Sequence, residues 1–598
     1  MLQGLARPLP AACTPNPPAA AAAARPRAAL ADAAMLAGAA RLHRLGAAGA
    51  AALACGSRLW PPAARAAGHG ARLAPGTARC LADAGGGGAA GGGEELPELV
   101  LWVISRGGSV DGATLANLAG RDGGSGWGLK ATRDLPAGAR LIELPAACLL
   151  TYDPDSCDAR LLALIQQVPE ELWGGRLALA LLAHRAAGAG SGFAPYVAHL
   201  PRGFPGVPMF FAREAIDAID YPPVVEQVKK RCRWLHRFST DALAPLPGTA
   251  ADPFGGAAVD INSLGWALAA VTSRAFRVRG PSHPAALLPL VDMANHSFEP
   301  NAELLPAGGG GVVMVAKRQL AAGEPLLLSY GPLSNDFLLM DYGFIVPSNP
   351  HDRVAMRFDI NLLNAGAAVA NVMDGSSFLE LDAGPAWKRR LLADLGLAGQ
   401  GADLGVQVGG PQHVDWRLLA ATRGLAAKYQ SEVEGRSLQE LGDWERPLNK
   451  QNEAAALRTL LGVCSVLLSN FRSTLDDDGA LLATGVIGGG GAGQQQGGQQ
   501  AAAAPLGEEL RTAVQFRSER KRVLAAAISG ISGRVRAVPG MAGLRDGPAG
   551  AGVTRKGERP PPATARGFAA GAGGGGSSSN GNGNGNGNGN GNGKPRRK

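Results

Sequence analysis

Two short segments between residues 287 and 344 hold polar and aromatic side chains that could bind a small molecule and act on it. Residues 290–297 read Leu-Val-Asp-Met-Ala-Asn-His-Ser, and residues 328–331 read Leu-Ser-Tyr-Gly. Asn295 and His296 place an amide and an imidazole beside an apolar run, so both can hydrogen-bond a polar ligand. Tyr330 follows an apolar strand pattern and precedes a glycine, which lets the backbone turn sharply. The pattern predicts a small-molecule site.

A third segment, residues 341–344 (Asp-Tyr-Gly-Phe), completes a pattern that is similar to a known family. Asp292 and Asn301 lie on either side of Asn-His and fit the same order. The whole set resembles the SET-domain protein lysine methyltransferases, and within them the Rubisco large-subunit methyltransferase group. A Ser-Arg-Ala-Phe segment at residues 273–276 is also similar to that group.

The resemblance implies a role for each matching residue, and Tyr330 would be the catalytic tyrosine. It implies S-adenosylmethionine as cofactor, bound by Ser125, Gly126, Trp127, Ser273, Phe276, Asn295, His296, Tyr330 and Phe344. It implies binding of the substrate lysine by Arg274, Asp292 and Tyr342. Taken singly, these residues have plainer interpretations, because a lone histidine is usually structural, an arginine can simply pair with an acid and aromatic residues often fill a core.

The chemistry implied is a direct displacement, in which a lysine amine attacks the sulfonium methyl group from behind. The amine must first lose its proton, and a solution pKa of about 10.4 falls in a dehydrated channel near a cation. The amine, methyl carbon and sulfur must then be collinear, so positioning supplies much of the rate. Tyr330 and backbone carbonyls can hold that line, and no metal is required.

The glycines of residues 122–128 (Asp-Gly-Gly-Ser-Gly-Trp-Gly) also fit, formally, the loop of Rossmann-type methyltransferases. That loop needs a buried strand before it and a helix after it, whereas a strand-turn-strand pattern follows here. In the SET interpretation the glycines let the backbone approach the cofactor closely. Alone, the motif is a weak signal, because a simple glycine turn is the commoner explanation.

The secondary structure expected around these segments alternates between helices and strands along the chain. Residues 94–117 have helical apolar spacing, and residues 126–132 and 140–144 are expected to be strands joined by a turn. Helical spacing fills residues 158–280, and strands return at 312–316 and 326–330. Helices are expected again at 387–395, 415–430, 452–471 and 510–528.

The predicted fold class is α+β. A SET fold of short, mostly antiparallel strands would span residues 94–346 with a helical insertion at about 158–280, followed by an all-α lobe at 364–538. Three segments of that lobe resemble the substrate-binding domain of the Rubisco methyltransferase group, at residues 452–457, 473–478 and 513–521. A Gly/Gln-rich loop at about 485–505 and a Gly/Asn-rich basic tail at 539–598 are expected to be disordered.

Residues 1–93 form an Ala-, Pro- and Arg-rich leader that is poor in acids. Such a composition is typical of an organellar transit peptide, and a disordered extension is the alternative. The family match favours the chloroplast stroma over the mitochondrion, with the nucleus or cytosol if the leader is not a transit peptide.

The net charge of +9 lies mostly in the two termini, so the sequence between them is close to neutral. Nucleic-acid binding is therefore not expected. The 7 cysteines form no C-x-x-C pair, so structural zinc is not expected either. No apolar run approaches the ~18 residues of a membrane helix.

These observations predict a protein-lysine N-methyltransferase that uses S-adenosylmethionine. By resemblance, the first candidate substrates are the Rubisco large subunit and plastid fructose-bisphosphate aldolase, and we expect a monomer. Two alternatives stay open: a methyltransferase of a lysine or histidine in a non-plastid protein, and a catalytically silent SET-fold module that docks a partner.

Overall fold

The computed structural model describes residues 98–118, 126–154, 157–278, 283–372, 384–485 and 506–538. The predicted leader, the Gly/Gln loop from residue 486 and the basic tail lie outside the described residues, as does Ser125.

Short strands form two four-stranded sheets within the described residues. The first sheet is antiparallel throughout, in the order β1 (Ser109–Val110), β4 (Arg140–Leu144), β9 (Val312–Ala316) and β8 (Ala302–Pro306). The second has the order β2 (Ala113–Asn117), β3 (Trp127–Ala131), β10 (Pro325–Leu328) and β7 (Asn295–His296). Its last pair, β10 with β7, is parallel, and the other pairs are antiparallel. A small pair of β5 (Ala275–Phe276) and β6 (Ala286–Leu287) lies apart from both sheets. The predicted α+β fold of mostly antiparallel strands is confirmed.

The expected helical lead-in at residues 94–117 was wrong in its second half. Helix α3 (Glu98–Ser105) ends before two glycines, and β1 and β2 follow. Gly107 and Gly112 have φ of 81° and 76°, in the left-handed region that favours glycine, so the backbone turns twice where a helix would have continued. The apolar residues of 113–117 therefore belong to a strand paired with β3.

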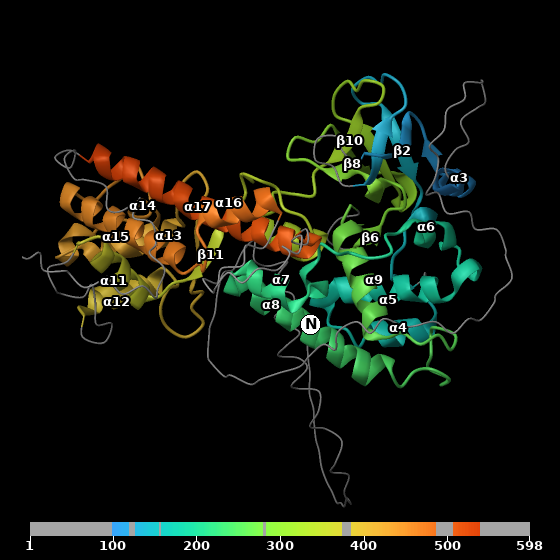
Figure 1. Cartoon of the computed structure of the whole chain (residues 1–598), viewed down its shortest axis with the longest axis horizontal. Coiled ribbons are helices and arrows are strands. Elements are labelled where there is room, and N and C mark those ends of the chain that lie inside the picture. Colours follow the sequence, from blue (N-terminus) through green and yellow to red (C-terminus); the bar gives the residue numbers. More distant parts are fainter. Residues whose placement is uncertain are drawn as a thin grey trace, which may run out of the picture. The chain divides into compact units, whose positions relative to one another are not determined.

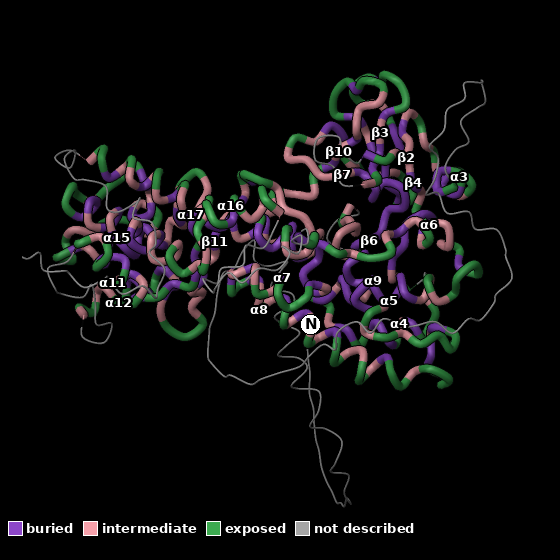
Figure 2. The backbone as a smooth tube through the Cα atoms, viewed as in Figure 1, coloured by how far each residue is buried: buried purple, intermediate pink, exposed green. Residues whose placement is uncertain are grey.

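The segment expected to hold the helical insertion is helical. It contains α4 (Ala159–Ile165), α5 (Trp173–Ala186), α6 (Ala194–His199), α7 (Arg213–Ile219), α8 (Pro222–Phe238) and α9 (Ile261–Arg274). Asp158 and Asp260 cap α4 and α9 by accepting hydrogen bonds from backbone N–H groups of the first turn, each at 2.8 Å. Helices α5 and α9 lie side by side (Figure 1). Their facing residues are almost entirely buried (Figure 2). Because α9 ends at Arg274, this packing fixes where the Ser-Arg-Ala-Phe segment begins.

The C-terminal lobe is helical apart from one strand pair, which the expectation of an all-α lobe missed. Its elements are β11 (Val354–Arg357), α11 (Ile360–Val369), α12 (Ala386–Asp394), β12 (Gly405–Val408), α13 (Trp416–Ala426), α14 (Leu438–Leu441), α15 (Lys450–Ser469), α16 (Leu475–Thr484) and α17 (Glu508–Ala537). Strands β11 and β12 pair antiparallel over their full length. Four-residue strands give too few alternations to stand out from helical spacing.

Two apolar cores hold the described residues together, and the second one joins the lobe to the insertion. The first packs both sheets against α5 and α9. The second contains the lobe helices and also Ile219 and Val224 of α7 and α8, with Leu339 from the segment that follows Tyr330. The helical insertion is thus shared between the two cores.

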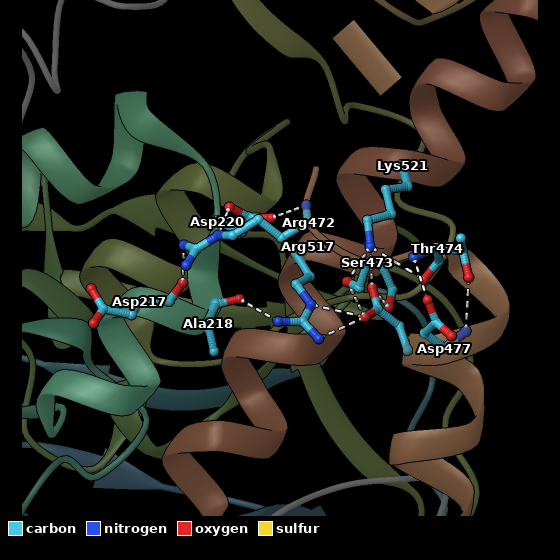
Figure 3. A network of polar contacts seen from close by, with 11 residues as sticks. Asp217, Ala218, Asp220, Arg472, Ser473, Thr474, Asp477, Arg517 and Lys521 are labelled. Atoms are coloured by element: carbon cyan, nitrogen blue, oxygen red, sulfur yellow. Dashed lines mark hydrogen bonds and ion pairs between the residues drawn. The ribbon is translucent and has the colours of Figure 1, made fainter. Parts of the chain in front are cut away.

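Helix α17 carries charged side chains into this second core, where a desolvated charge must be paired. Arg517 and Lys521 both reach the buried carboxylate of Asp478 on α16, at 2.7 and 2.6 Å (Figure 3). Burial raises the pKa of Asp478, but its bonds to Arg517 and Lys521 outweigh burial and hold that pKa below its usual range. Arg517 also donates to the carbonyl of Ala218, which ties α17 to α7.

None of the helices in the described ranges combines the length and the apolar character needed to cross a bilayer. In the same part of the chain, no group of three or more His, Cys, Asp or Glu side chains could hold a metal ion.

Helices α11 and α15 meet at two glycines, and this contact gives a stability prediction. A Cβ at Gly462 would overlap the backbone of Gly366, which cannot move aside. Gly462→Ala should therefore destabilise the protein by about 2 kcal/mol or more. Gly533→Ala, on the exposed side of α17 with open space around it, should be neutral or stabilising by up to about 1 kcal/mol. Thermal unfolding of the two variants measures this, and equal midpoints would contradict the proposed contact.

Candidate active site

The parallel pairing of β7 with β10 brings the two sequence motifs together. In its register Asn295 lies opposite Leu327, and His296 lies opposite Leu328, two residues before Tyr330. Asn301 also fixes β10, because its buried side chain accepts from the Leu327 N–H at 2.8 Å and donates to the Pro325 carbonyl at 2.8 Å. The role of Asn301 is thus to hold the strand that leads to Tyr330.

His296 is held as a neutral hydrogen-bond donor. Its Nδ1 accepts from the backbone N–H of Tyr330 at 3.2 Å, which places the ring proton on Nε2. Burial is the main cause that lowers the pKa of His296, so the ring is uncharged at neutral pH. Nε2 is buried and has no partner. A buried donor without a partner points to a ligand that would accept from it.

Tyr330 is fixed as a protonated phenol. Its hydroxyl donates to the carbonyl oxygen of Ala294 at 2.8 Å. Burial raises the pKa of Tyr330 to about 12, with the nearby Arg274 lowering it and Asp292 raising it. At neutral pH the hydroxyl therefore acts as a hydrogen-bonding group and not as a base.

Aromatic rings surround Tyr330, and most of them were predicted site residues. Tyr342 stacks on Tyr330 with ring centroids 4.9 Å apart, and His296 stacks at 5.0 Å. Phe276 meets Tyr330 edge-on at 6.5 Å, and Phe344 lies 6.1 Å from Tyr342. The structure therefore brings together residues that are up to 68 positions apart in the sequence.

Asp292 and Arg274 lie next to this cluster with unpaired polar atoms. Asp292 Oδ2 accepts from the hydroxyl of Tyr196 at 2.5 Å, whereas Oδ1 is buried without a partner. Arg274 donates from Nη1 to the Asp292 backbone carbonyl at 3.0 Å, and its Nε has no partner. Burial raises the pKa of Asp292 to about 6, although Arg274 and Tyr196 pull it down. Arg274 thus bonds the backbone of Asp292 and also acts on the charge of its carboxyl group.

Tyr196, on α6, was missed by the sequence analysis. It is fully buried in a helix whose spacing looked like ordinary core, and its partner Asp292 lies 96 residues further on. Nothing in the local pattern connects the two. The only signal was a phenol among apolar residues, since a buried tyrosine hydroxyl needs a partner.

The glycine segment lies against Asn295. Gly126 has φ of 87°, and Trp127, the first residue of β3, is 57% exposed. The closest approach is at Gly128, where a Cβ would come within 2.9 Å of the Asn295 Nδ2. Gly126 and Trp127 were predicted to bind the cofactor, and Gly128 is the residue that lets the Asn295 side chain come so near to β3.

Ser273 differs from the other predicted residues. It lies in the last turn of α9, and its hydroxyl donates to the Ala269 carbonyl at 2.7 Å. The side chain is thereby engaged within its own helix. A cofactor role for this hydroxyl is not supported by its contacts.

A cavity of about 250 Å³ opens beside the two stacked tyrosines. Tyr330 and Tyr342 form one wall, and α5, α8 and α9 supply the others through residues that include Trp173, Trp234 and Thr272. Its size suits a side chain, and its walls combine apolar and aromatic residues with three charged ones, Glu171, Arg231 and Asp341. The two tryptophans were not expected from the sequence, because each fits an ordinary helix.

The chain matches two family models. Residues 126–331 match the SET domain, and residues 382–524 match the model described as Rubisco LSMT substrate-binding. The chain carries a SET domain followed by a Rubisco LSMT substrate-binding domain. The resemblance seen in the motifs is confirmed.

Solved structures of the SET domain of LSMT share this fold. One, bound to lysine and AdoHcy, has a TM-score of 0.52 at 16% identity and covers 74% of this chain and 92% of that chain. Another, bound to MeLysine and AdoHcy, has a TM-score of 0.51 at 17% identity, covering 75% and 94%.

Curated relatives include actin-histidine N-methyltransferases. The protein from Gallus gallus is 24% identical over 408 residues, which are 65% of this chain and 63% of the relative. That from Danio rerio is 28% identical over 279 residues, 44% of each chain. The alignment with the first relative thus spans under two thirds of its length.

Asp292 gives a prediction about stability and pH. Because its pKa is raised in the folded chain, the folded state binds more protons than the unfolded state between about pH 4 and 6, and stability falls as pH rises through this window. Asp292→Asn removes that contribution, so the stability of the variant relative to wild type should improve by about 1 kcal/mol from pH 5 to pH 7.5. Urea unfolding at the two pH values measures it, and an unchanged difference would contradict the raised pKa.

Proposed function

We propose that this protein is a SET-class protein methyltransferase that uses S-adenosylmethionine and methylates a lysine side chain of another protein. The observation that carries the proposal is the convergence of Tyr330, the Ala294 carbonyl and the unpaired His296 Nε2 at the end of one parallel strand pair. This convergence lies beside a cavity of side-chain size.

The residues present fit the cofactor. His296 Nε2 is a buried donor without a partner, and the amide of Asn295 stands beside it. Gly128 lets the Asn295 amide lie against the backbone of β3, where a Cβ would come within 2.9 Å of Nδ2. Asn295, His296, Phe344, Gly126 and Trp127 would hold the cofactor, which supplies an electrophilic methyl group when bound. Ser125 is proposed with them from the sequence alone.

The chain's own residues would prepare the acceptor. The aromatic walls of Tyr330, Tyr342 and Trp173 exclude water, which favours the uncharged amine that can act as a nucleophile. The Tyr330 hydroxyl is held in place by its bond to the Ala294 carbonyl. It would align the amine nitrogen of the acceptor with the methyl group. Asp292, whose buried Oδ1 has no partner, does not line the cavity, and its contact with the acceptor is proposed from the sequence.

Lysine is the acceptor that these walls suit best. Tyrosine and tryptophan faces attract a cationic head group, and an apolar lining fits a long methylene stem. Glu171 and Asp341 add carboxylates to the cavity wall, and Asp341 is paired there with Arg231 at 2.7 Å. Histidine is the second candidate, because the relatives from Gallus gallus and Danio rerio are named actin-histidine N-methyltransferases.

The substrate would be a protein docked on the C-terminal lobe. The match of residues 382–524 to a substrate-binding model supports this role, and the motif resemblance makes the Rubisco large subunit and plastid aldolase the first candidates. We further propose the chloroplast stroma as the location, on the composition of the leader, and a monomeric enzyme.

Transfer of labelled methyl groups tests the activity. Wild-type protein with radiolabelled S-adenosylmethionine and hypomethylated chloroplast extract should label one or a few protein bands. Tyr330→Phe should lose about 100-fold or more of the rate, because it removes the hydroxyl fixed on Ala294 while keeping the ring. Tyr152→Phe, a half-buried tyrosine outside the aromatic cluster, is the matched control and should keep the rate.

The product identifies the acceptor. Acid hydrolysis of the labelled band should release methyllysine, and methylhistidine would establish the second candidate instead. No transfer to any extract protein, together with no cofactor binding, would favour a silent docking module and overturn the proposal.

The location has a separate test. A fluorescent protein fused behind residues 1–93 should enter the plastid. Mitochondrial or cytosolic fluorescence would contradict a stromal enzyme, without bearing on the reaction itself.

A further inference from the structure

Arg520, on helix α17 of the C-terminal lobe, makes its ionic contacts with residues close to the tyrosine pair. Its side chain is completely buried. Nη1 donates to Asp336 Oδ1 at 2.8 Å and to the Arg353 carbonyl at 2.5 Å. Asp352 forms an ion pair with Nη2. Asp336 lies on α10 (Asn335–Phe337), six residues after Tyr330, and 184 residues separate it from Arg520.

The two carboxylates that bind Arg520 belong to residues 335–352, a segment held together by several hydrogen bonds. Asp352 accepts from the backbone and side-chain nitrogens of Asn335 at 2.9 and 2.8 Å. The Asn335 side chain is fully buried and exchanges two hydrogen bonds with the backbone of Val346, at 3.0 and 2.9 Å. Asn335 and Val346 are thus bonded to each other, and Arg520 links this segment to the lobe through Asp336 and Asp352.

The same segment, residues 335–352, contains Tyr342 and Phe344. Tyr342 ends the π-helical turn that follows α10, and its ring stacks on Tyr330 at 4.9 Å. A shift of α10 would therefore move Tyr342, and through the stack it would move Tyr330. Gly343 packs directly on Gly206, so the segment has no free space to absorb such a shift.

The charges make Arg520 hard to replace. One guanidinium faces two carboxylates, the buried one of Asp352 and that of Asp336, which is 23% exposed, so these three side chains together carry a net negative charge. Burial raises the pKa of Asp336 to about 6, with Arg520 lowering it and Asp352 raising it. Without Arg520, two like charges would face each other, and the segment would have to move or take up a proton.

Lys521, the next residue of α17, offers the comparison. It is equally buried, and its ion pair with Asp478 stays within the lobe. Its other contacts are with Ser473 and the Thr474 carbonyl (Figure 3). If buried ion pairs on α17 served stability alone, Arg520 and Lys521 would act alike.

We propose that Arg520 is a positioning residue for methyl transfer: through Asp336 and Asp352 it sets the segment that stacks Tyr342 on Tyr330. This inference rests on the proposed methyltransferase function. Because residues 382–524 match the substrate-binding model, the same helix that belongs to the docking lobe fixes the tyrosine pair. The placement of a docked protein and the alignment of its acceptor are set by one helix.

Four variants of the full chain test the proposal: Arg520→Gln, Arg520→Gln/Asp336→Asn, Asp336→Asn and Lys521→Gln. The double variant restores the net charge of the wild-type group with neutral hydrogen-bonding side chains. Asp336→Asn keeps the Arg520 ion pair with Asp352, so it can be measured if Arg520→Gln fails to fold.

Hydrogen exchange measures the position of the segment directly. Amides of residues 333–346 should exchange about tenfold faster in Arg520→Gln, and at the wild-type rate in Lys521→Gln. Asp336→Asn should show a smaller increase in the same segment. Unchanged exchange in both Arg520→Gln and Asp336→Asn would overturn the proposal, whether or not the protein transfers methyl groups.

Kinetics on the protein band labelled in chloroplast extract give the second readout. Arg520→Gln should lower kcat about tenfold while leaving KM for S-adenosylmethionine nearly unchanged, because β7 and β10 are intact. The double variant should recover most of the loss. An equal fall in Lys521→Gln, or a fall in kcat that follows the loss of thermal stability in all variants, would mean that Arg520 is only structural. Absence of transfer by the wild type would instead refute the proposed function and leave the exchange result to decide the position of the segment.

Discussion

The parallel pairing of two very short strands is the constraint on which the site depends. With His296 opposite Leu328, the imidazole accepts the Tyr330 N–H and stacks on the Tyr330 ring with centroids 5.0 Å apart. One hydrogen bond thereby fixes the tautomer of His296, the direction of its free Nε2–H and the place of Tyr330. A parallel pair requires a long connection between its strands, and β8 and β9 of the first sheet lie in that connection. Other elements place residues around this strand pair. Helix α9 ends at Arg274, and α6 carries Tyr196, whose hydroxyl donates to Asp292.

Buried ion pairs restrict the positions of the segments that they join. An ion pair away from water is a weak source of stability, since apolar residues of equal size often do as well. Even so, this chain buries Arg423, Arg520 and Lys521 almost completely, each against a carboxylate. Such pairs tolerate few arrangements, because a displaced partner leaves an unpaired charge. Of the three, Arg520 is the one whose carboxylates belong to the segment carrying Tyr342.

Much of the fold and of the site could be predicted from the sequence because the residues that define the site lie in short contiguous motifs. Asn295, His296 and Tyr330 were identifiable from their neighbours, and the structure brings them together. Contacts between distant segments were not predictable in this way. The Tyr196 bond to Asp292 and the Arg520 bond to Asp336 leave no trace in local periodicity, because each residue fits its own helix. The lead-in was misjudged for another reason, since apolar spacing over 24 residues hid two glycines that turn the chain into strands.

Binding of S-adenosylhomocysteine, measured by titration calorimetry on the full chain, tests the central claim most directly. If the strand pair presents Asn295 and the His296 Nε2–H to one cofactor, the wild type should bind one molecule per chain. His296→Phe, which keeps a ring but has no donor, should then weaken binding about tenfold, as expected for a buried donor that pairs with the ligand. No heat of binding by the wild type, or equal affinity in the variant, would contradict the account.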